Sequence, residues 1–458
     1  MSWNKALVAS TLFGFFFAGA LMAQVLSEPV TPQQAETLKT TLTPFGGEKA
    51  GNKDGTIPAW TGGYTTPIPG FKEGGRRPDP FANEKPLFSI TAKNMDQYTD
   101  KLTDGVKAML KKYPNYRLDI YPTHRTACAP QYMYDNTFKN ATRAKLVQGS
   151  AGPQPEGAFG GVPFPIPSNG LEVIWNHLLR PRPESWQFSM HTMLVTASGA
   201  RVLTTDATAQ QLMPYYYKGG SPEKFNGEYW LFRMVDSGPP IRSGEAILSR
   251  ENINDDKSQT WVYLTGQRRV RKLPNACCDT PTPATAGIMG FDDLEVFWGR
   301  TARFDWKLIG KQEMYVPYNS NRTWVPTKDS DVIGDHFINP DYVRWELHRV
   351  WVVEATLAKG QRHQAPRGRY YIDEDTWMGV LSDRWDSGGR LWKTMWMLPI
   401  VAPDWPGLIE QSFGFYDLVS GAWFYNGLMN EKAEQLKITP LWRDTFFQPE
   451  SLAGEGIR

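Results

Sequence analysis

Three adjacent acidic residues, Asp373, Glu374 and Asp375, form the sharpest cluster of side chains that could do acid–base chemistry. Two carboxylates on either side of a glycosidic bond are the reactive groups of most glycoside hydrolases. These acids, however, separate a Tyr-Tyr-Ile run from a Trp-Met-Gly-Val-Leu run, and Asp residues in hairpin turns usually form Asx turns in contact with water. We therefore interpret them as a solvated turn. We interpret Asp292 and Asp293 as a helix cap.

The histidines lack the spacing of a metal site, because no two of them stand four apart on a predicted helix with a third ligand. His124 with Arg125, and His177, are candidates for polar contacts beneath a lid, and a structural polar network is favoured over catalysis. The chain also has no Gly-x-Ser-x-Gly elbow and no phosphate loop. We therefore expect no catalytic residue, no metal and no cofactor, and a protein that is not an enzyme. The six histidines are His124, His177, His191, His336, His348 and His363.

The three cysteines, Cys128, Cys277 and Cys278, are candidates for one disulfide. In an oxidising compartment Cys128 could pair with either member of the adjacent pair, whereas a bridge between neighbours in sequence is rarer. One thiol is left over in either case. The adjacent pair is also a poor metal site, because neighbouring side chains of a strand point apart.

Aromatic side chains are the remaining candidates for a site, since 13% of the chain is Phe, Trp or Tyr, with 18 Trp. Each indole buries a large area. If such rings line a sheet face that stays partly unfilled, that face is a ligand cavity; the alternative is that they simply fill a β-rich core. The cavity candidates are Trp230, Trp261, Trp345, Trp351, Trp377, Trp385 and Trp392.

A basic run of Arg268, Arg269, Arg271 and Lys272 occupies a predicted strand over 268–273. Alternation places Arg269 and Arg271 on one face of that strand. Charges on an edge strand prevent further strands from adding to the sheet, which is the simpler interpretation. The functional alternative is a rim on which these arginines contact lipid phosphates or an acidic partner.

The elements that would position these residues are predicted to be mostly β-strands. From about residue 186 the hydrophobic pattern has a period of two, and turn signals such as Ser198-Gly199 and Ser420-Gly421 separate the runs. Arg369–Lys393 continues as hairpin after hairpin. A sheet of ten or more strands must curl or split. The predicted fold class is α+β, a strongly curved antiparallel sheet, or half-open barrel, covered by helices and an extended N-terminal arm.

Four segments are expected along the 458 residues. Residues 1–23 have the short positive start, the apolar run and the small residues of a signal peptide, with cleavage after Ala20 or Ala23. Residues 24–182 form an arm and an irregular, helical lid layer, including a helix over 89–113. Residues 183–430 form the curved sheet, and 431–458 form a tail packed on it.

The charge balance excludes one class of partner. The net charge is +2, from 50 basic and 48 acidic residues, so no overall field attracts the chain to nucleic acid. The signal peptide predicts a secreted protein that is soluble in an extracytoplasmic space after cleavage.

Several stretches resemble a known superfamily. Gln267–Lys272 (QRRVRK), Gly287–Leu294 (GIMGFDDL) and Asp386–Lys393 (DSGGRLWK) are similar to the outer-membrane lipoprotein-sorting proteins of the LolA/LolB-like fold. His124-Arg-Thr and Arg344–Ala355 (RWELHRVWVVEA) resemble a branch of large, uncharacterised proteobacterial secreted proteins. The resemblance implies a curved sheet with a lid over a cavity for acyl chains. It also implies partners: an inner-membrane transporter of the resistance-nodulation-division type and an outer-membrane protein.

Three functions are compatible with these observations. The first is a periplasmic carrier or chaperone that binds a lipid, a lipoprotein or another hydrophobic ligand in a cavity. The second is a secreted hydrolase of glycans or lipids that uses carboxylates of the 373–386 hairpins. The third is an envelope adaptor whose interior is filled by its own side chains and binds nothing.

Overall fold

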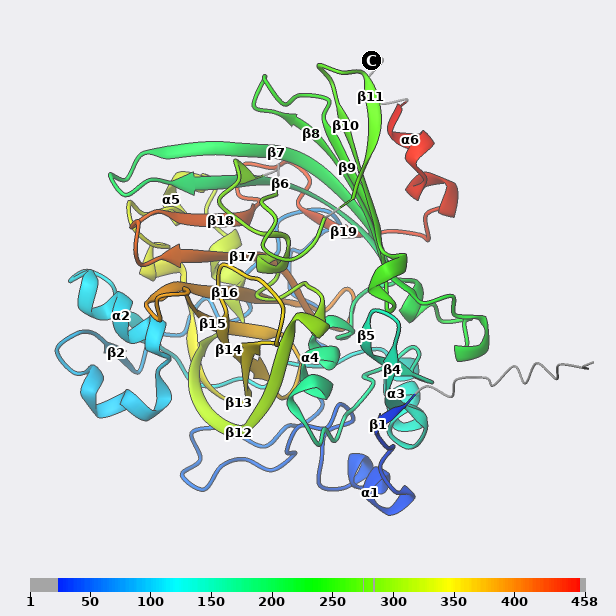
Figure 1. Ribbon diagram of the computed structural model, residues 1–458. Coiled ribbons are helices and arrows are strands. Elements are labelled where there is room, and N and C mark those ends of the chain that lie inside the picture. The colour runs from blue at the N-terminus through cyan, green and yellow to red at the C-terminus, as the bar shows by residue number, and fades with distance from the viewer. Residues whose placement is uncertain (1–23, 275, 283–284, 454–458) are drawn as a thin grey trace, which may run out of the picture.

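A large, curved, mainly antiparallel sheet dominates the computed structural model, which describes residues 24–274, 276–282 and 285–453 (Figure 1). The predicted signal peptide lies outside the described residues. The sixteen strands of this sheet are β2 (Phe88–Ile90), β3 (Leu118–Ile120), β6 (Ser185–Val195), β7 (Arg201–Leu212), β8 (Glu228–Gly238), β9 (Ala246–Asn252), β10 (Gln259–Leu264), β11 (Arg269–Leu273), β12 (Phe304–Pro317), β13 (Trp345–Leu357), β14 (Arg367–Asp373), β15 (Gly379–Trp385), β16 (Leu391–Ala402), β17 (Gly407–Asp417), β18 (Trp423–Leu428) and β19 (Leu436–Ile438).

The strand order along the sheet is β11-β10-β9-β8-β7-β6-β18-β17-β16-β15-β14-β13-β3-β2, with β12 paired to β13 and β19 to β6. Every pair is antiparallel except β13 with β3. The two ends of this order, β11 and β2, do not pair with each other, so the described sheet stays open. The predicted fold class, an open and curved antiparallel sheet with helices and an N-terminal arm over it, is confirmed.

Helices and short segments cover the sheet. The helices are α1 (Pro32–Glu36), α2 (Asp104–Lys112), α3 (Gln131–Arg143), α4 (Gly170–Leu178), α5 (Asp329–Val332) and α6 (Pro449–Ala453), and a separate small sheet contains β1 (Val25–Ser27), β4 (Lys145–Gly149) and β5 (Gly152–Glu156). Helix α4 packs on β12 and β13, and α2 packs on β15 and β16. Strands β8 to β11 fan away from the rest of the sheet, with α6 against β9, β10 and β11 (Figure 1). No helix among the described residues is long and apolar enough to cross a membrane.

The hairpins predicted from the period of two are present. β14, β15 and β16 follow one another as antiparallel neighbours, as do β6 and β7 around Ser198 and β17 and β18 around Ser420. Strands β15 and β16 are buried along almost their whole length. Because both faces are covered there, the two sequences do not alternate strictly: most of β16 is an apolar run, whereas β15 also buries Ser382, Asp383 and Arg384.

The single helix predicted over 89–113 is wrong. That segment contains β2, a kinked 3-10 segment over Met95–Lys101 and the separate helix α2. The break has a local cause: Leu102 and Thr103 are extended, and the Thr103 hydroxyl accepts the Val106 amide as the N-cap of a new helix. An N-cap residue begins a new helix even where the apolar spacing is unbroken. The continuous spacing therefore concealed the boundary between the two segments.

Helix α2 is fixed to the sheet at its first turn. The Gly105 amide donates to Oδ2 of the buried Asp383 at 2.9 Å, and a Cβ at Gly105 would overlap Asp383 Oδ1 and Thr394 Oγ1. Burial raises the pKa of Asp383 to about 6. The hydrogen bond from the Gly105 amide acts in the opposite direction, because it stabilises the ionised carboxylate. The lack of a side chain at residue 105 is what allows this close approach.

We expect Gly105→Ala to destabilise the protein. An Ala inside a helix normally stabilises it by about 1 kcal/mol relative to Gly, but here the added methyl must displace Asp383 and Thr394, at a cost of about 2 kcal/mol. Chemical denaturation followed by tryptophan fluorescence measures the difference. The control is Lys107→Ala on the same helix, whose side chain forms only a partly exposed ion pair with Asp104. An increase in stability for Gly105→Ala would contradict this docking.

Candidate functional site

One face of β6 to β10 borders an unfilled cavity. Its volume is about 150 Å³. Because one water molecule needs ~10–15 Å³ of such space, the cavity has room for roughly ten waters, which would fill ~300 Å³ as liquid. That is the lower end of the range of ligand pockets. The sheet contributes apolar side chains to its wall, among them Phe188, Met190, Phe232, Met234 and Ile247.

A group of four aromatic rings closes one side of this cavity. Trp230 of β8 lies 4.4 Å from Trp298, measured between ring centroids, and 5.2 Å from Phe232. Tyr229 stacks on Trp298 at 5.6 Å. The Trp230 Nε1 proton is donated to Gln211 Oε1 at 2.7 Å, which fixes this ring. Trp298 belongs to the segment between β11 and β12, so the cluster joins that segment to the sheet.

The cover over the cavity is this segment, the described residues of 274–300, and not the N-terminal layer. Met289, Phe291, Leu294 and Trp298 line the cavity from it, whereas no residue of 24–182 is part of the wall. The sequence analysis predicts a lid formed by residues 24–182. The structure differs because the N-terminal layer packs on the other end of the sheet, over β12 to β16.

Buried ion pairs hold the cover to the body of the protein. Glu295 pairs with Arg180 and Arg182, while Asp293 pairs with Lys393 at 2.8 Å and Arg384 at 2.7 Å. Burial alone would raise the pKa of Asp293, but these two cations outweigh it and lower the pKa to about 2. Asp293 also accepts the Gly290 amide at 3.0 Å. The N-cap of this 3-10 turn, Phe291–Asp293, is Gly290, and Asp292 pairs with His363, so the two acids are not the helix cap that the sequence predicts.

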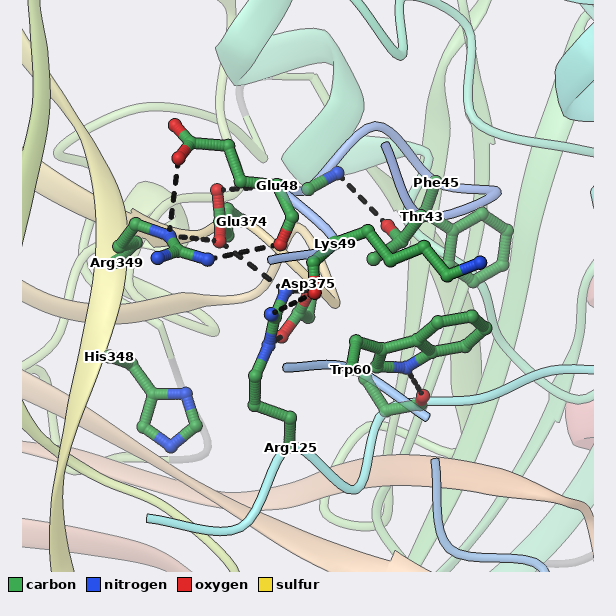
Figure 2. Close-up of polar contacts among 12 residues, drawn as sticks. Thr43, Phe45, Glu48, Lys49, Trp60, Arg125, His348, Arg349, Glu374 and Asp375 are labelled. Carbon is green, nitrogen blue, oxygen red and sulfur yellow. Dashed lines mark hydrogen bonds and ion pairs between the residues drawn. The ribbon is translucent and has the colours of Figure 1, made fainter. Parts of the chain in front are cut away.

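The 373–375 turn is not solvated, which corrects its interpretation as a surface turn. Asp373, Glu374 and Asp375 are each at most 3% exposed. Arg125 donates from Nε and Nη2 to both oxygens of Asp375, at 2.8 and 2.7 Å, and Arg349 Nε donates to Glu374 Oε1 at 2.7 Å (Figure 2). The cations come from segments far away in sequence, so the pairing could not be predicted from the local pattern.

The same two arginines hold the N-terminal arm. Arg349 Nη2 donates to the Glu48 carbonyl at 3.0 Å, and Arg125 Nη1 donates to the Lys49 carbonyl at 3.3 Å (Figure 2). Arg349 Nη2 also donates to the Ala50 carbonyl at 2.6 Å. The Glu48 amide donates to Glu374 Oε2 at 3.1 Å. This arm clamp, as we call the contacts of Arg125, Arg349 and the 373–375 acids with residues 48–50, leaves no room for a substrate at those carboxylates.

One acid of the clamp region has a raised pKa although His348 Nδ1 lies 3.9 Å from its Oδ1. Burial, followed by the neighbouring Asp375, raises the pKa of Asp373 to about 6. Its Oδ2 accepts from the Tyr318 hydroxyl at 3.1 Å and from Thr376, and Tyr318 stacks on His348. Asp373 does not line the cavity on β6 to β10, so the perturbation belongs to a packed polar interior.

The predicted polar contacts lie in separate places. Arg125 is in the arm clamp, whereas His124 pairs with Glu84 at 2.7 Å. His177 is fully buried, within hydrogen-bonding distance of the Trp377 and Phe297 carbonyls, and burial, then Arg180, lowers its pKa. Arg269 and Arg271 are exposed on β11, the end strand of the sheet. Three of the five thus touch the N-terminal arm or the cover, and none lines the cavity.

The predicted tryptophans are also dispersed, and of the seven only Trp230 lines the cavity. Trp261 points to the opposite face of β10, against the C-terminal segment with Trp442 and Phe446. Trp351 and Trp377 stack near the arm clamp at 6.2 Å, and the Trp377 Nε1 proton is donated to the Phe45 carbonyl. The remaining three lie elsewhere: Trp345 is buried at the start of β13, Trp385 lies under Arg367, and Trp392 donates to Asp417.

No disulfide joins the three cysteines, all of which are described. Cys128 is buried and contacts the Tyr64 carbonyl at 3.4 Å. Cys277 and Cys278 have their sulfur atoms 2.6 Å apart, and Cys277 lines the cavity. The structure thus brings together the neighbouring pair rather than Cys128 and one of its two candidates.

One histidine lies beside carboxylates in an arrangement that a metal ion could use. His191, Asp329 and Glu431 place one ligand atom each within 4.8 Å of one another. Hydrogen bonding accounts for this cluster, because His191 Nδ1 lies 2.5 Å from Asp329 Oδ2 and its Nε2 lies 3.4 Å from Asp206. The three residues come from β6, α5 and the chain after β18, which is why no sequence spacing revealed them.

Comparison with known proteins places the chain in a family. Residues 89–453 match the family described as protein of unknown function DUF1329, and an uncharacterised protein of Pseudomonas aeruginosa is 38% identical over 96% of this chain and 97% of its own length. The chain belongs to the DUF1329 family. The resemblance to a large uncharacterised secreted family is thereby confirmed at the level of the family.

Solved structures similar to this DUF1329 protein include three of related description. A domain of an outer-membrane lipoprotein-sorting protein from Vibrio parahaemolyticus covers 62% of this chain and 98% of its own, with 12% identity and a TM-score of 0.43. A DUF1329 family protein from Desulfovibrio piger covers 59% and 92%, with 13% identity and a TM-score of 0.39. A LolA superfamily protein from Nitrosomonas europaea covers 62% and 100%, with 14% identity and a TM-score of 0.35. At this level of similarity none of them decides the function of this DUF1329 chain.

Several cavity residues of this DUF1329 protein were not predicted. Phe232 and Met234 follow Trp230 at a period of two, so the alternation of β8 could have indicated a shared face. Trp298 stood in a segment that looked like a short helix. Glu251 and Asp255 gave no signal, because a carboxylate near a strand end is ordinarily solvated.

We expect Arg125→Met to destabilise this DUF1329 protein by about 3–5 kcal/mol, since it leaves the buried Asp375 carboxylate without its cation. The arm should loosen at the same time, because Arg125 also holds its carbonyls. Chemical denaturation measures the first effect, and limited proteolysis within residues 45–60 measures the second. Arg390→Ala, which removes an exposed ion pair with Asp386, should leave both measurements nearly unchanged. Equal behaviour of the two variants would show that the arm clamp is not needed.

Proposed function

We propose that this protein is a periplasmic carrier that binds the apolar part of a lipid, a lipoprotein or another amphiphile in the cavity on β6 to β10. The observation that supports this most directly is a cavity of about 150 Å³ that the surrounding aromatic rings leave unfilled. The chain needs no catalytic group for this function. Affinity comes from the burial of apolar surface, and release comes from movement of the 274–300 cover.

The energetics of burial are suited to a carrier. Each buried CH₂ group contributes about 0.8 kcal/mol, so an acyl chain that enters the cavity gains several kcal/mol. Loss of translational freedom and of chain flexibility offsets part of that gain. The resulting affinity retains a ligand in water and still permits its transfer to a membrane or to a second protein.

The other two functions have less support. A hydrolase of the 373–386 hairpins would need accessible carboxylates, but Asp375 and Glu374 are neutralised by arginines in the arm clamp, and Asp386 forms an exposed turn with Arg390. An adaptor that binds nothing would have a filled interior. The unfilled space beside Trp230 and Trp298 favours the carrier over the adaptor.

The proposal includes a site of transfer. β11 is an end strand of the sheet, and the exposed Arg269 and Arg271 on it stand a few residues before the cavity-lining Leu273. Exposed arginines attract lipid phosphates. We propose that this edge faces the membrane, and that the partners implied by the resemblance, a resistance-nodulation-division transporter and an outer-membrane protein, exchange ligand with the carrier.

We expect Ile247→Trp to abolish ligand binding, because the larger side chain points into the cavity from β9 and would occupy the space for an acyl chain. Displacement of the fluorescent probe N-phenyl-1-naphthylamine by dodecanol measures binding. The apparent affinity should fall at least tenfold while the unfolding transition remains cooperative. The matched control is Val202→Trp, on the exposed part of β7, which should bind like the original protein. Binding that survives Ile247→Trp would place the ligand elsewhere.

We also expect Arg269→Ala combined with Arg271→Ala to weaken binding to vesicles that contain phosphatidylglycerol, with little effect on neutral vesicles. Loss of two exposed cations removes about 1 kcal/mol each of attraction to an anionic surface. Vesicle co-sedimentation at low and at physiological salt measures this. Lys111→Ala combined with Lys112→Ala, at the end of α2, removes the same charge far from the cavity. An equal loss in both double variants would refute a specific role for β11.

A further inference from the structure

The cavity has a polar end as well as an apolar one. Cross-strand pairing places Ile247 of β9 opposite Met234, Ser249 opposite Phe232, and Glu251 opposite Trp230. The β9 side chains in the wall thus change from apolar to hydroxyl to carboxyl over four residues, or ~13 Å at ~3.3 Å per residue. This length and this gradient match an amphiphile that lies along the strand.

Two carboxyl groups meet at the polar end. Glu251 points into the cavity from β9, and Asp255 reaches it from the short 3-10 helix Asp255–Lys257. Ser249 donates a hydrogen bond to Glu251. Among the described residues no side chain forms an ion pair with either acid, and Arg250, the cation next to Glu251 on β9, pairs with Glu228 and Asp444 instead. Two carboxyl groups that face an apolar space without an ion pair are costly to ionise, so they are either protonated or bound to a positive ligand.

The other charged groups that face this end are few. The cover contributes Arg300 and the thiol of Cys277, while Glu295 is already paired with Arg180 and Arg182. When both carboxyl groups are ionised, the one guanidinium of Arg300 balances only one of the two negative charges. Burial, followed by the neighbouring Glu251, raises the pKa of Asp255 to about 8, and burial also raises the pKa of Glu251. This is the behaviour of acids that lack a sufficient counter-charge.

We propose that the ligand of this cavity is an amphiphile with a cationic amine headgroup, held by Glu251 and Asp255 while its apolar chain lies toward Ile247 and Met234. This inference rests on the proposed carrier function and names its ligand class. The ammonium group supplies the positive charge that the two acids lack. Arg300 then stays available to balance the second carboxylate.

The test uses three ligands that share a twelve-carbon chain: dodecylamine, dodecanol and dodecanoate. Each displaces N-phenyl-1-naphthylamine from the full chain, below its micelle concentration, at pH 7. Dodecylamine should displace the probe at a concentration at least tenfold lower than the other two. If none of the three binds, the carrier function fails and this inference fails with it. If all three bind alike, or dodecanoate binds best through Arg300, the carrier remains and the amine headgroup is refuted.

Isosteric variants identify the groups responsible. Glu251→Gln combined with Asp255→Asn should remove the advantage of dodecylamine over dodecanol while leaving the affinity for dodecanol unchanged. Asp256→Asn, at the exposed neighbour of Asp255, is the matched control and should keep that advantage. Retention of the full advantage in the double variant would overturn the assignment to these two acids.

The pH dependence provides an independent readout. An ammonium binds the ionised carboxylate, so the affinity for dodecylamine should rise from pH 6 to pH 8, by up to about tenfold per pH unit for one coupled proton. It should level off above pH 8, whereas the affinity for dodecanol should stay flat. Cys277→Ser removes a further titratable group that faces this end and should not change the slope. The Tyr229 hydroxyl also lines it, but burial raises the pKa of Tyr229 well above its usual value. A flat profile for dodecylamine would overturn the proposal.

Discussion

Pairing of buried charge is the constraint on which this structure depends. Asp375 and Glu374 are almost fully buried, and each carboxylate forms an ion pair there with the guanidinium of Arg125 or Arg349. Removal of one member of such a pair leaves an uncompensated charge in a medium of low dielectric constant. Because the same two arginines donate to the carbonyls of residues 48–50, the ion pairs also decide where the N-terminal arm lies.

The same constraint explains how a cavity can persist on an aromatic sheet. The 274–300 cover is held by Asp293 and Glu295 to cations of the body, so it does not need to fill the cavity with its own side chains to stay in place. Directional, buried pairs fix the distance between cover and sheet. Packing of Trp298 on Trp230 then closes one side and leaves space beside the rings.

Much of the sheet could be predicted from local signals. The alternation and the turn residues of β6, β7, β17 and β18 specify hairpins, and a hairpin is a contact between neighbours in sequence. The helix boundary at Thr103 was missed, because an N-cap within a continuous apolar spacing has little effect on the period. The burial of Asp373 to Asp375 was missed for a different reason: their partners lie about 25 and 250 residues away.

The sequence by itself determined the family, the antiparallel sheet and the edge position of the basic strand, since these follow from motif, period and charge. Only the tertiary structure decided which aromatic rings surround empty space and which acids are buried. A period of two assigns side chains to alternate faces but does not say what covers either face. Trp230 and Trp261 illustrate this: they have similar strand contexts, yet one borders the cavity and the other packs under the C-terminal segment.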